Sequence, residues 1–295
     1  MLDLSITLLR LIQLSSGAIL FGVPLFSLYG PREAGTLMPR TIWIALFGMV
    51  LATTVTVVLQ TSSLTAIPPE AVPFADITWY LTETRIGSVN GLRLLGLVGY
   101  IILIATAASS MARSVIQTLL GGAIVGSFAL TGHGAENPWH AFSDFVHVLM
   151  AGVWVGALVS LCGLLFHASR NSQFIPATVK GLNSFSHVGV AVVVLLVASG
   201  VSNALFSFGI SDPSALSRSE YGQILLIKVA LLAGMLVLAA ANRYRLAPSL
   251  ERSLRTGNAS DALRSLRSSV FTETTIAVVV LGLAASLAST KPPDV

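Results

Sequence analysis

Eight long apolar runs, separated by more polar segments, dominate the pattern of hydrophobic and polar positions along the chain. Each run has about 20 residues or more, which is the length of helix that crosses roughly 30 Å of hydrocarbon. The pattern predicts an all-α membrane protein with eight transmembrane helices in one bundle. No soluble domain is expected at either end, so residues 1–295 form a single membrane domain. The runs cover residues about 5–28, 41–62, 88–109, 113–132, 139–166, 185–209, 222–243 and 270–289.

Two connections between the runs are longer than the others and carry helical patterns of their own. In the first, apolar side chains at helical spacing follow Pro73, which predicts a short interfacial helix at about residues 73–87. The second is a basic cytoplasmic loop at about residues 245–269, whose leucines fall on apolar faces. We expect this loop to contact the anionic cytoplasmic leaflet.

Composition agrees with a polytopic membrane protein. Hydrophobic residues make up 54% of the chain and charged residues 10%, with a mean hydropathy of +0.82. A soluble domain has about 25% charged residues. The single cysteine, Cys162, excludes an intrachain disulfide framework and a Cys-pair zinc motif. The net charge of +4 does not indicate nucleic-acid binding, because the basic residues lie mainly in loops between apolar runs.

The distribution of arginine and lysine between loops predicts the orientation. The connections after the first, third, fifth and seventh runs are rich in basic residues, and such loops stay in the cytoplasm. Only Arg85, Arg218 and Lys291 lie on the other side. Both termini are therefore expected to face away from the cytoplasm. The basic cytoplasmic positions are Arg32, Arg40, Arg113, Arg170, Lys180, Arg243, Arg245, Arg252, Arg255, Arg264 and Arg267.

The fifth run is unusual because polar, metal-competent side chains crowd its outer end. His140, Asp144 and His147 follow an i, i+4, i+7 spacing and fall on one face of a helix. Ionisable groups that face lipid are costly, so this face should point into protein or a polar cavity. His133 and Glu136 lie just before the run. We expect metal or proton handling at this mouth, although the set matches no fixed ligand-spacing motif.

Other polar residues inside the runs have simpler explanations. Arg10, Arg93 and Lys228 lie one or two turns into their spans, and snorkelling to the headgroups is favoured for them. The alternative is that one of them pairs with Asp144 and orients it. Glu273 is expected to favour the helix N-terminus at the start of the eighth run.

Asn203 and the small residues of the fifth and sixth runs are expected to serve helix packing. Gly152 and Gly156 would let helices approach closely. For Asn203, a structural hydrogen bond between helices is favoured over a role at the site.

The two remaining histidines lie at the predicted cytoplasmic end. At 1.5 Å rise per residue, His187 should lie on the order of 20 Å deeper than His147, so one ion cannot touch both. Helix-end capping is favoured for His167. For His187 the sequence leaves capping and a second site open.

The order and spacing of several motifs resemble the copper resistance protein D (CopD) family of bacterial inner-membrane proteins. The resemblance extends over nearly the whole chain, from the first run to the eighth. The motifs are LLRLIQLSSGAILFG in the first run, ALTGHG before the fifth, DFVHVLMAGVWVGALVSL in the fifth, FSHVGVAVVVLLVASGVSNAL in the sixth and YGQILLIKVALLAGMLVLAAANRYRLAP in the seventh.

The resemblance implies an eight-span inner-membrane protein that moves copper or helps the cell tolerate it. It also implies a separate periplasmic copper carrier of the CopC type, which some relatives carry as a fused domain. The family's histidine and tryptophan match His147 and Trp154, and its lysine and asparagine match Lys228 and Asn242. Relatives place a histidine shortly after the first-span arginine, where this chain has Gln13. Glutamine is a poorer copper ligand than imidazole, so any site shared between the first and fifth spans is in question.

The main hypothesis is copper transport, with no enzymatic activity. Copper would be captured by His133 and His140 at the periplasmic side and pass to His147, with Met150 one turn on. Asp144 would hold an imidazole tautomer by accepting its N–H. No GxxxxGK[ST] motif is present, so ATP hydrolysis within the chain does not drive the process.

Two alternatives remain. The first is a b-type haem electron carrier, with haem held between paired histidines on facing helices. The outer pair would be His147 with His133 or His140, and the inner pair His167 with His187. The second is a membrane scaffold that delivers copper without transporting it.

Overall fold

The eight apolar runs form eight helices that are long and apolar enough to cross a membrane, as predicted. The computed structural model describes residues 2–106, 111–208, 218–256 and 260–290, and this part of the chain contains no β-strand. The long helices are α1 (Leu2–Tyr29), α3 (Pro39–Thr65), α5 (Arg85–Thr106), α6 (Met111–Gly126), α7 (Pro138–Ala168), α8 (Ile175–Phe208), α10 (Glu220–Ala241) and α12 (Ser260–Leu287).

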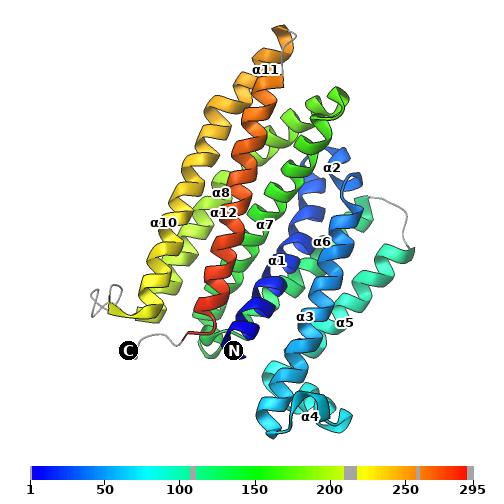
Figure 1. Ribbon diagram of the computed structural model, residues 1–295, viewed down its shortest axis with the longest axis vertical. Helices are drawn as coiled ribbons and strands as arrows, with labels where there is room; N and C mark the ends of the chain where they lie inside the picture. The colour runs from blue at the N-terminus through cyan, green and yellow to red at the C-terminus, as the bar shows by residue number, and fades with distance from the viewer. Residues whose placement is uncertain (1, 107–110, 209–217, 257–259, 291–295) are drawn as a thin grey trace.

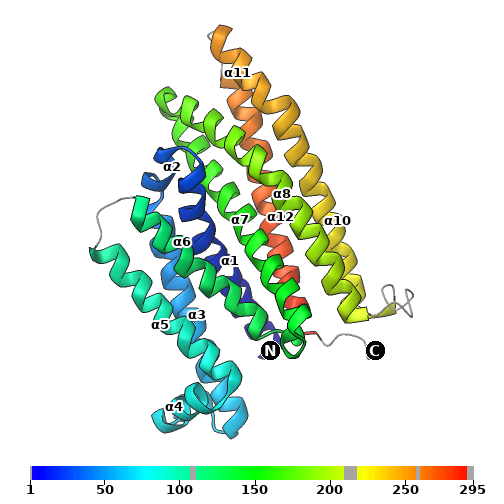
Figure 2. The same ribbon diagram turned by 180° about the vertical axis from the view of Figure 1, so that it is seen from behind.

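Shorter helices cover the two ends of the bundle. The first and last described residues lie at the same end as α4 (Phe74–Glu83), and we call this the terminal end (Figures 1 and 2). The opposite, distal end carries α2 (Arg32–Thr36) and α11 (Ala247–Thr256) (Figure 1). The remaining short elements are η1 (Pro69–Ala71), η2 (Ser127–Leu130), η3 (His133–Glu136), η4 (Ser172–Phe174) and the π-helical η5 (Asn242–Leu246).

Close contact between α1 and α7 sets the centre of the bundle. A Cβ atom built on Gly156 would lie 2.2 Å from the carbonyl carbon of Gly22, so only glycine allows the two backbones to approach this closely. Small residues at an interface have this function in membrane helix pairs. The packing role expected for Gly156 is therefore confirmed.

Two groups of buried side chains surround α1. The larger one joins α7, α8, α11 and α12 and includes Leu161, Leu164 and Leu250. The smaller one joins α1, α3, α5 and α6 and includes Leu46 and Tyr100. Tyr100 also donates a hydrogen bond to the Leu20 carbonyl over 2.8 Å, which ties α5 to α1.

The stretch expected as a basic loop at residues 245–269 is largely helical. It contains α11 and the first turns of α12. Leu250 and Leu266 are fully buried in the larger core. The leucine pattern therefore reflects packing against the bundle. From the sequence alone, the same pattern predicts contact with the membrane surface.

Arg93 does not snorkel to the headgroups as expected. Its side chain is only 4% exposed, with the guanidinium carbon 4.1 Å from the centre of the Phe128 ring. Nε donates to Ser127 over 2.9 Å and Nη1 donates to Asn90 over 2.9 Å. A buried network therefore holds this arginine, and its Nη2 atom is buried without a hydrogen-bond partner among the described residues.

The network continues into α4 at the terminal end. The Asn90 amide donates to the Tyr80 hydroxyl over 3.1 Å, and that hydroxyl donates to Gln60 on α3. Burial raises the pKa of the Tyr80 hydroxyl above its usual value, so the hydroxyl remains a donor near neutral pH. The predicted short helix is thereby bonded to two spans.

Candidate functional site

A cavity of about 360 Å³ opens between α1, α7, α8, α10 and α12 toward the terminal end, and we call it the terminal cavity. It gathers polar side chains from four helices, α1, α7, α8 and α10. These are Arg10, His140, Asp144, His147, Asn203 and Lys228.

The start of α7 fixes the first of these side chains. The Asn137 side chain accepts hydrogen bonds from the backbone N–H groups of Trp139 and His140, over 3.0 and 3.3 Å, and Pro138 occupies the first helical position. The His140 ring stacks on Phe206 of α8, with the centroids 4.8 Å apart. On its other side it lies against Gly134, where an added Cβ would come within 2.4 Å of the ring.

His147 lies two turns deeper along the same face of α7. At 1.5 Å per residue, this places it about 10 Å from the level of His140. Its Nδ1 atom lies 3.0 Å from the Ser199 hydroxyl of α8. That hydroxyl also donates to the Leu195 carbonyl over 2.6 Å. This contact orients the imidazole and leaves Nε2 as the nitrogen available for a ligand.

Asp144 lies between the two histidines and is held by α8. Asn203 donates its amide N–H to Asp144 over 2.6 Å, so the expected interhelical hydrogen bond is present and lies at the cavity itself. Asn203 Oδ1 is buried and has no hydrogen-bond partner. An orphaned acceptor beside a cavity indicates a place where a donor group or a ligand can bind.

Two basic side chains line the terminal cavity together with Asp144. These are Arg10 from α1 and Lys228 from α10. Arg10 Nη1 also reaches the Ala288 carbonyl of α12 over 3.5 Å. Pairing of one of these basic residues with Asp144 stays a prediction.

In the described structure, the other predicted site residues are not among those that line the cavity. Met150 packs against the larger core, and Glu136 lies exposed in η3. Gln13 faces α3, where its amide donates to Thr53 and Thr56 over 3.4 and 3.3 Å. Because position 13 faces away from the cavity, its departure from the family pattern does not remove a ligand there.

His133 lies in η3, and its side chain falls outside the described part of the structure.

The histidines at the distal end make local contacts. His167 Nδ1 lies 2.8 Å from the Gly163 carbonyl in the last turns of α7, which is the helix-end role expected for it. His187 Nδ1 lies 2.7 Å from the Asn183 carbonyl and its side chain is exposed. Ser199, which contacts His147, is twelve residues further along α8, so the two histidines are separated by about 18 Å.

This arrangement gives little support to haem binding. His140 and His147 project from the same helix, so they cannot approach one iron from opposite sides. His167 and His187 each have a ring nitrogen close to a carbonyl of their own helix.

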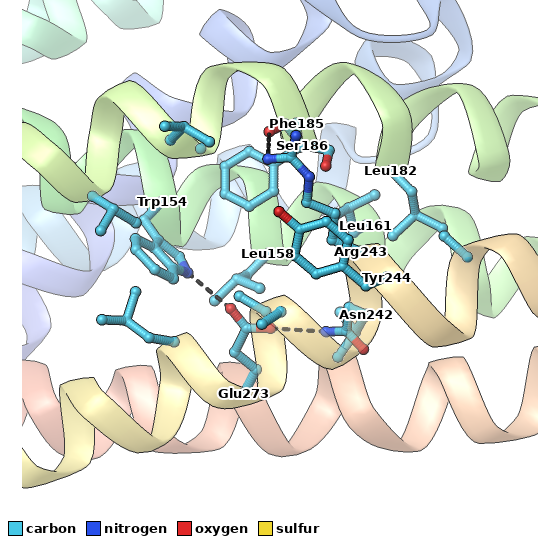
Figure 3. A pocket seen from close by; sticks show the side chains of 18 of the residues that line it. Trp154, Leu158, Leu161, Leu182, Phe185, Ser186, Asn242, Arg243, Tyr244 and Glu273 are labelled. Atoms are coloured by element: carbon cyan, nitrogen blue, oxygen red, sulfur yellow. Dashed lines mark hydrogen bonds between the residues drawn. The ribbon is translucent and has the colours of Figure 1, made fainter.

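A second pocket, of about 260 Å³, lies toward the distal end between α7, α8, α10, η5 and α12, and we call it the distal pocket (Figure 3). At its wall, Glu273 is 2% exposed. It accepts hydrogen bonds from Trp154 Nε1 and Asn242 Nδ2, both over 3.0 Å. Trp154, expected near the metal site, therefore belongs to this pocket.

The capping role expected for Glu273 is wrong. The helix α12 begins at Ser260, thirteen residues earlier, so Glu273 lies well inside it. The sequence signal that could have identified it is an acidic residue next to an apolar run with no neighbouring arginine or lysine.

Comparison with known proteins gives a consistent family. The profile of copper resistance protein D matches residues 179–287, and that of the copper resistance protein D-like N-terminal domain matches residues 1–141. Copper resistance protein D of Pseudomonas syringae pv. tomato is 35% identical over 290 residues, which cover 93% of this chain and 92% of the relative. No solved structure matches the chain.

Two further relatives match over shorter stretches. Inner membrane protein YebZ of Escherichia coli K12 is 33% identical over 42% of this chain and 41% of its own length. Copper transport protein CutJ of Bacillus subtilis 168 is 34% identical over 38% of this chain and 21% of its own length. Together with the eight spans, these relatives identify a multi-pass inner-membrane protein. The chain belongs to the copper resistance protein D family.

Proposed function

We propose that this protein carries copper from the periplasm into the cytoplasm and that copper enters through the terminal cavity. The observation that carries the proposal is that two imidazoles and one carboxylate line a cavity within the membrane-spanning bundle. Imidazole suits copper, and ionisable side chains within a membrane mark ion pathways. The family and its copper-transporting relative CutJ support copper as the cargo.

The distribution of basic residues between the two ends of the bundle supports an orientation with the terminal cavity open to the periplasm. The basic residues between spans gather at the distal end, in the connections after the first, third, fifth and seventh spans. Under the positive-inside rule this end faces the cytoplasm and the terminal end faces the periplasm. A separate periplasmic carrier of the CopC type would then deliver copper directly to the cavity mouth.

The ligand arrangement suits passage better than storage. Within the described residues, no three histidine, cysteine, aspartate or glutamate side chains are grouped closely enough to hold one ion. A transported ion must bind strongly enough to enter and weakly enough to leave. We therefore assign His140 to capture and His147 to the deeper step, with Asp144 between them.

Copper uptake into reconstituted vesicles tests the proposal. Replacing His147 by alanine removes the deeper imidazole, so the rate of copper uptake should fall at least tenfold. His187→Ala is the matched control, because this exposed histidine lies about 18 Å away and should leave uptake unchanged. Wild-type vesicles that take up no more copper than empty ones would refute transport, and uptake that survives His147→Ala would refute the assigned route.

A further inference from the structure

Glu273 in the distal pocket is a buried acid without a counter-ion. In the described part of the chain, its carboxylate accepts two hydrogen bonds, from an indole and an amide, and no cation lies within ion-pair distance of it. A buried carboxylate is costly unless it is paired or takes up a proton. Within a membrane such a residue commonly belongs to a proton relay.

The amide of Asn242 provides a second, independent observation. Asn242 is 7% exposed, and its Nδ2 donates to Glu273 while its Oδ1 is buried without a partner (Figure 3). An amide has a donor end and an acceptor end of similar shape. Turned by half a rotation, it would present Oδ1 to Glu273, where it can accept the O–H of a protonated acid. The pair can therefore hydrogen-bond in both protonation states.

The distal pocket lacks the donors that copper prefers. No histidine, cysteine or methionine is among the residues that line it in the described structure. Copper favours nitrogen and sulfur ligands over a single carboxylate. A proton is therefore a better ligand for Glu273 than the transported metal.

In the described structure, the other charged or titratable groups around Glu273 form no hydrogen bond or ion pair with it. From η5, Arg243 donates to the Ser186 carbonyl over 2.8 Å, and Tyr244 is largely exposed. From α7, Cys162 lies 3.3 Å from the Thr274 hydroxyl. The segment of α8 that lines the pocket contributes no titratable side chain.

The distal pocket and the terminal cavity are separate, and they lie between the same helices α7, α8, α10 and α12. On α7, His147 of the cavity and Trp154 of the pocket are seven residues apart, so they share a helix face at levels about 10 Å apart.

We propose that Glu273 and Asn242 form an inner proton-binding site, and that copper movement is coupled to proton exchange between this site and the compartment at the distal end. The coupling rests on the proposed transport, and the proton site itself does not. A cuprous ion passing inward would be balanced by a proton that Glu273 takes up from the distal side and that leaves at the terminal side, because each carries one positive charge. Charge is then balanced without ATP hydrolysis.

Vesicles with a trapped pH-sensitive dye test the coupling. Addition of copper should produce a change in internal pH with the wild-type protein, and Glu273→Gln should reduce that change at least tenfold. Asp261→Asn is the matched control, because this carboxylate lies at the same end, in the first turn of α12, is 81% exposed, lies 3.8 Å from Arg264 and does not line the distal pocket. The control should behave like the wild type.

Infrared difference spectroscopy tests the proton site without transport. A pH change should produce the C=O band of a protonated carboxyl group in the wild type, and this band should be missing in Glu273→Gln. If that variant does not fold, Asn242→Leu keeps the acid and should shift the pH at which the band appears. A wild-type spectrum without such a band, or a band unchanged in both variants, would overturn the proton site.

The outcomes separate the two proposals. Copper uptake without any pH change, or with a pH change that persists in Glu273→Gln, would overturn the coupling and leave transport standing. Absence of copper uptake by the wild type would overturn transport and the coupling together, and the infrared titration would still decide whether Glu273 binds a proton.

Discussion

Replacing Lys228 by glutamine tests whether the charge balance of the terminal cavity limits how tightly copper is held. Lys228 lines the cavity with His147 and Asp144. At a typical separation of about 7 Å across such a cavity, its charge and that of a bound copper ion repel by about 2 kcal/mol at an effective dielectric constant of about 20. Removing the lysine charge should therefore tighten copper binding by roughly 30-fold. Glutamine is a suitable replacement, because its amide is a poor copper ligand.

Copper affinity can be measured by competition with a coloured chelator, using protein in lipid nanodiscs at one fixed pH. Lys180→Gln is the matched control, because this exposed lysine belongs to the distal end of α8. Lys228→Arg keeps the positive charge and should bind copper as the wild type does.

The electrostatic reasoning fails if Lys228→Gln binds copper no more tightly than the wild type. It also fails if Lys180→Gln gains affinity to the same extent. Tighter binding should be accompanied by slower uptake into vesicles, because the ion then leaves the cavity less readily.

Two further predictions concern packing and hydrogen bonding. Gly156→Ala places a methyl group against the backbone of Gly22 and should destabilise the protein by about 1–3 kcal/mol, measured by unfolding in detergent. Gly234→Ala is the control, because no atom lies within 4 Å of the added Cβ, and it should be neutral or slightly stabilising. Equal stability of the two variants would contradict the close α1–α7 contact. Asn203→Leu removes a hydrogen bond to the Asp144 carboxylate and should cost about 1.5–3 kcal/mol in the same assay, and an unchanged unfolding midpoint would show that the bond contributes nothing.

Hydropathy was sufficient to predict the eight spans, but it placed the first residues of α8 and α12 too late in the sequence. The helix α8 begins at Ile175 and α12 at Ser260, about ten residues before the apolar runs that predict them. These early turns carry exposed polar residues such as Lys180 and Arg264, which lower the average hydropathy. The misplaced start of α12 is the reason that Glu273 was interpreted as a helix cap.

Helical spacing predicted the shared face of His140 and His147, because both lie on one helix. It could not predict which side chains from other helices would meet them. Asn203, Lys228 and Arg10 reach the cavity through packing between helices that are far apart in the sequence. The same limit applies to Gln13, whose direction toward α3 depends on how α1 is rotated in the bundle.

The π turn of η5 changes which residues of α10 and α11 point the same way. At 3.6 residues per turn, Met235 and Asn242 share a face, but Leu250 would lie about 80° further round a regular α-helix. The π turn absorbs one extra residue, which returns Leu250 to the face of Met235 and Asn242, and all three are buried. Deleting one residue within η5 would convert the π turn into a regular α-helical turn and leave Leu250 on the same face, whereas inserting one further residue would rotate α11 by about 100° and turn Leu250 out of the core. The number of residues in this segment therefore sets the face that α11 presents to the core, with almost no trace in the hydropathy profile.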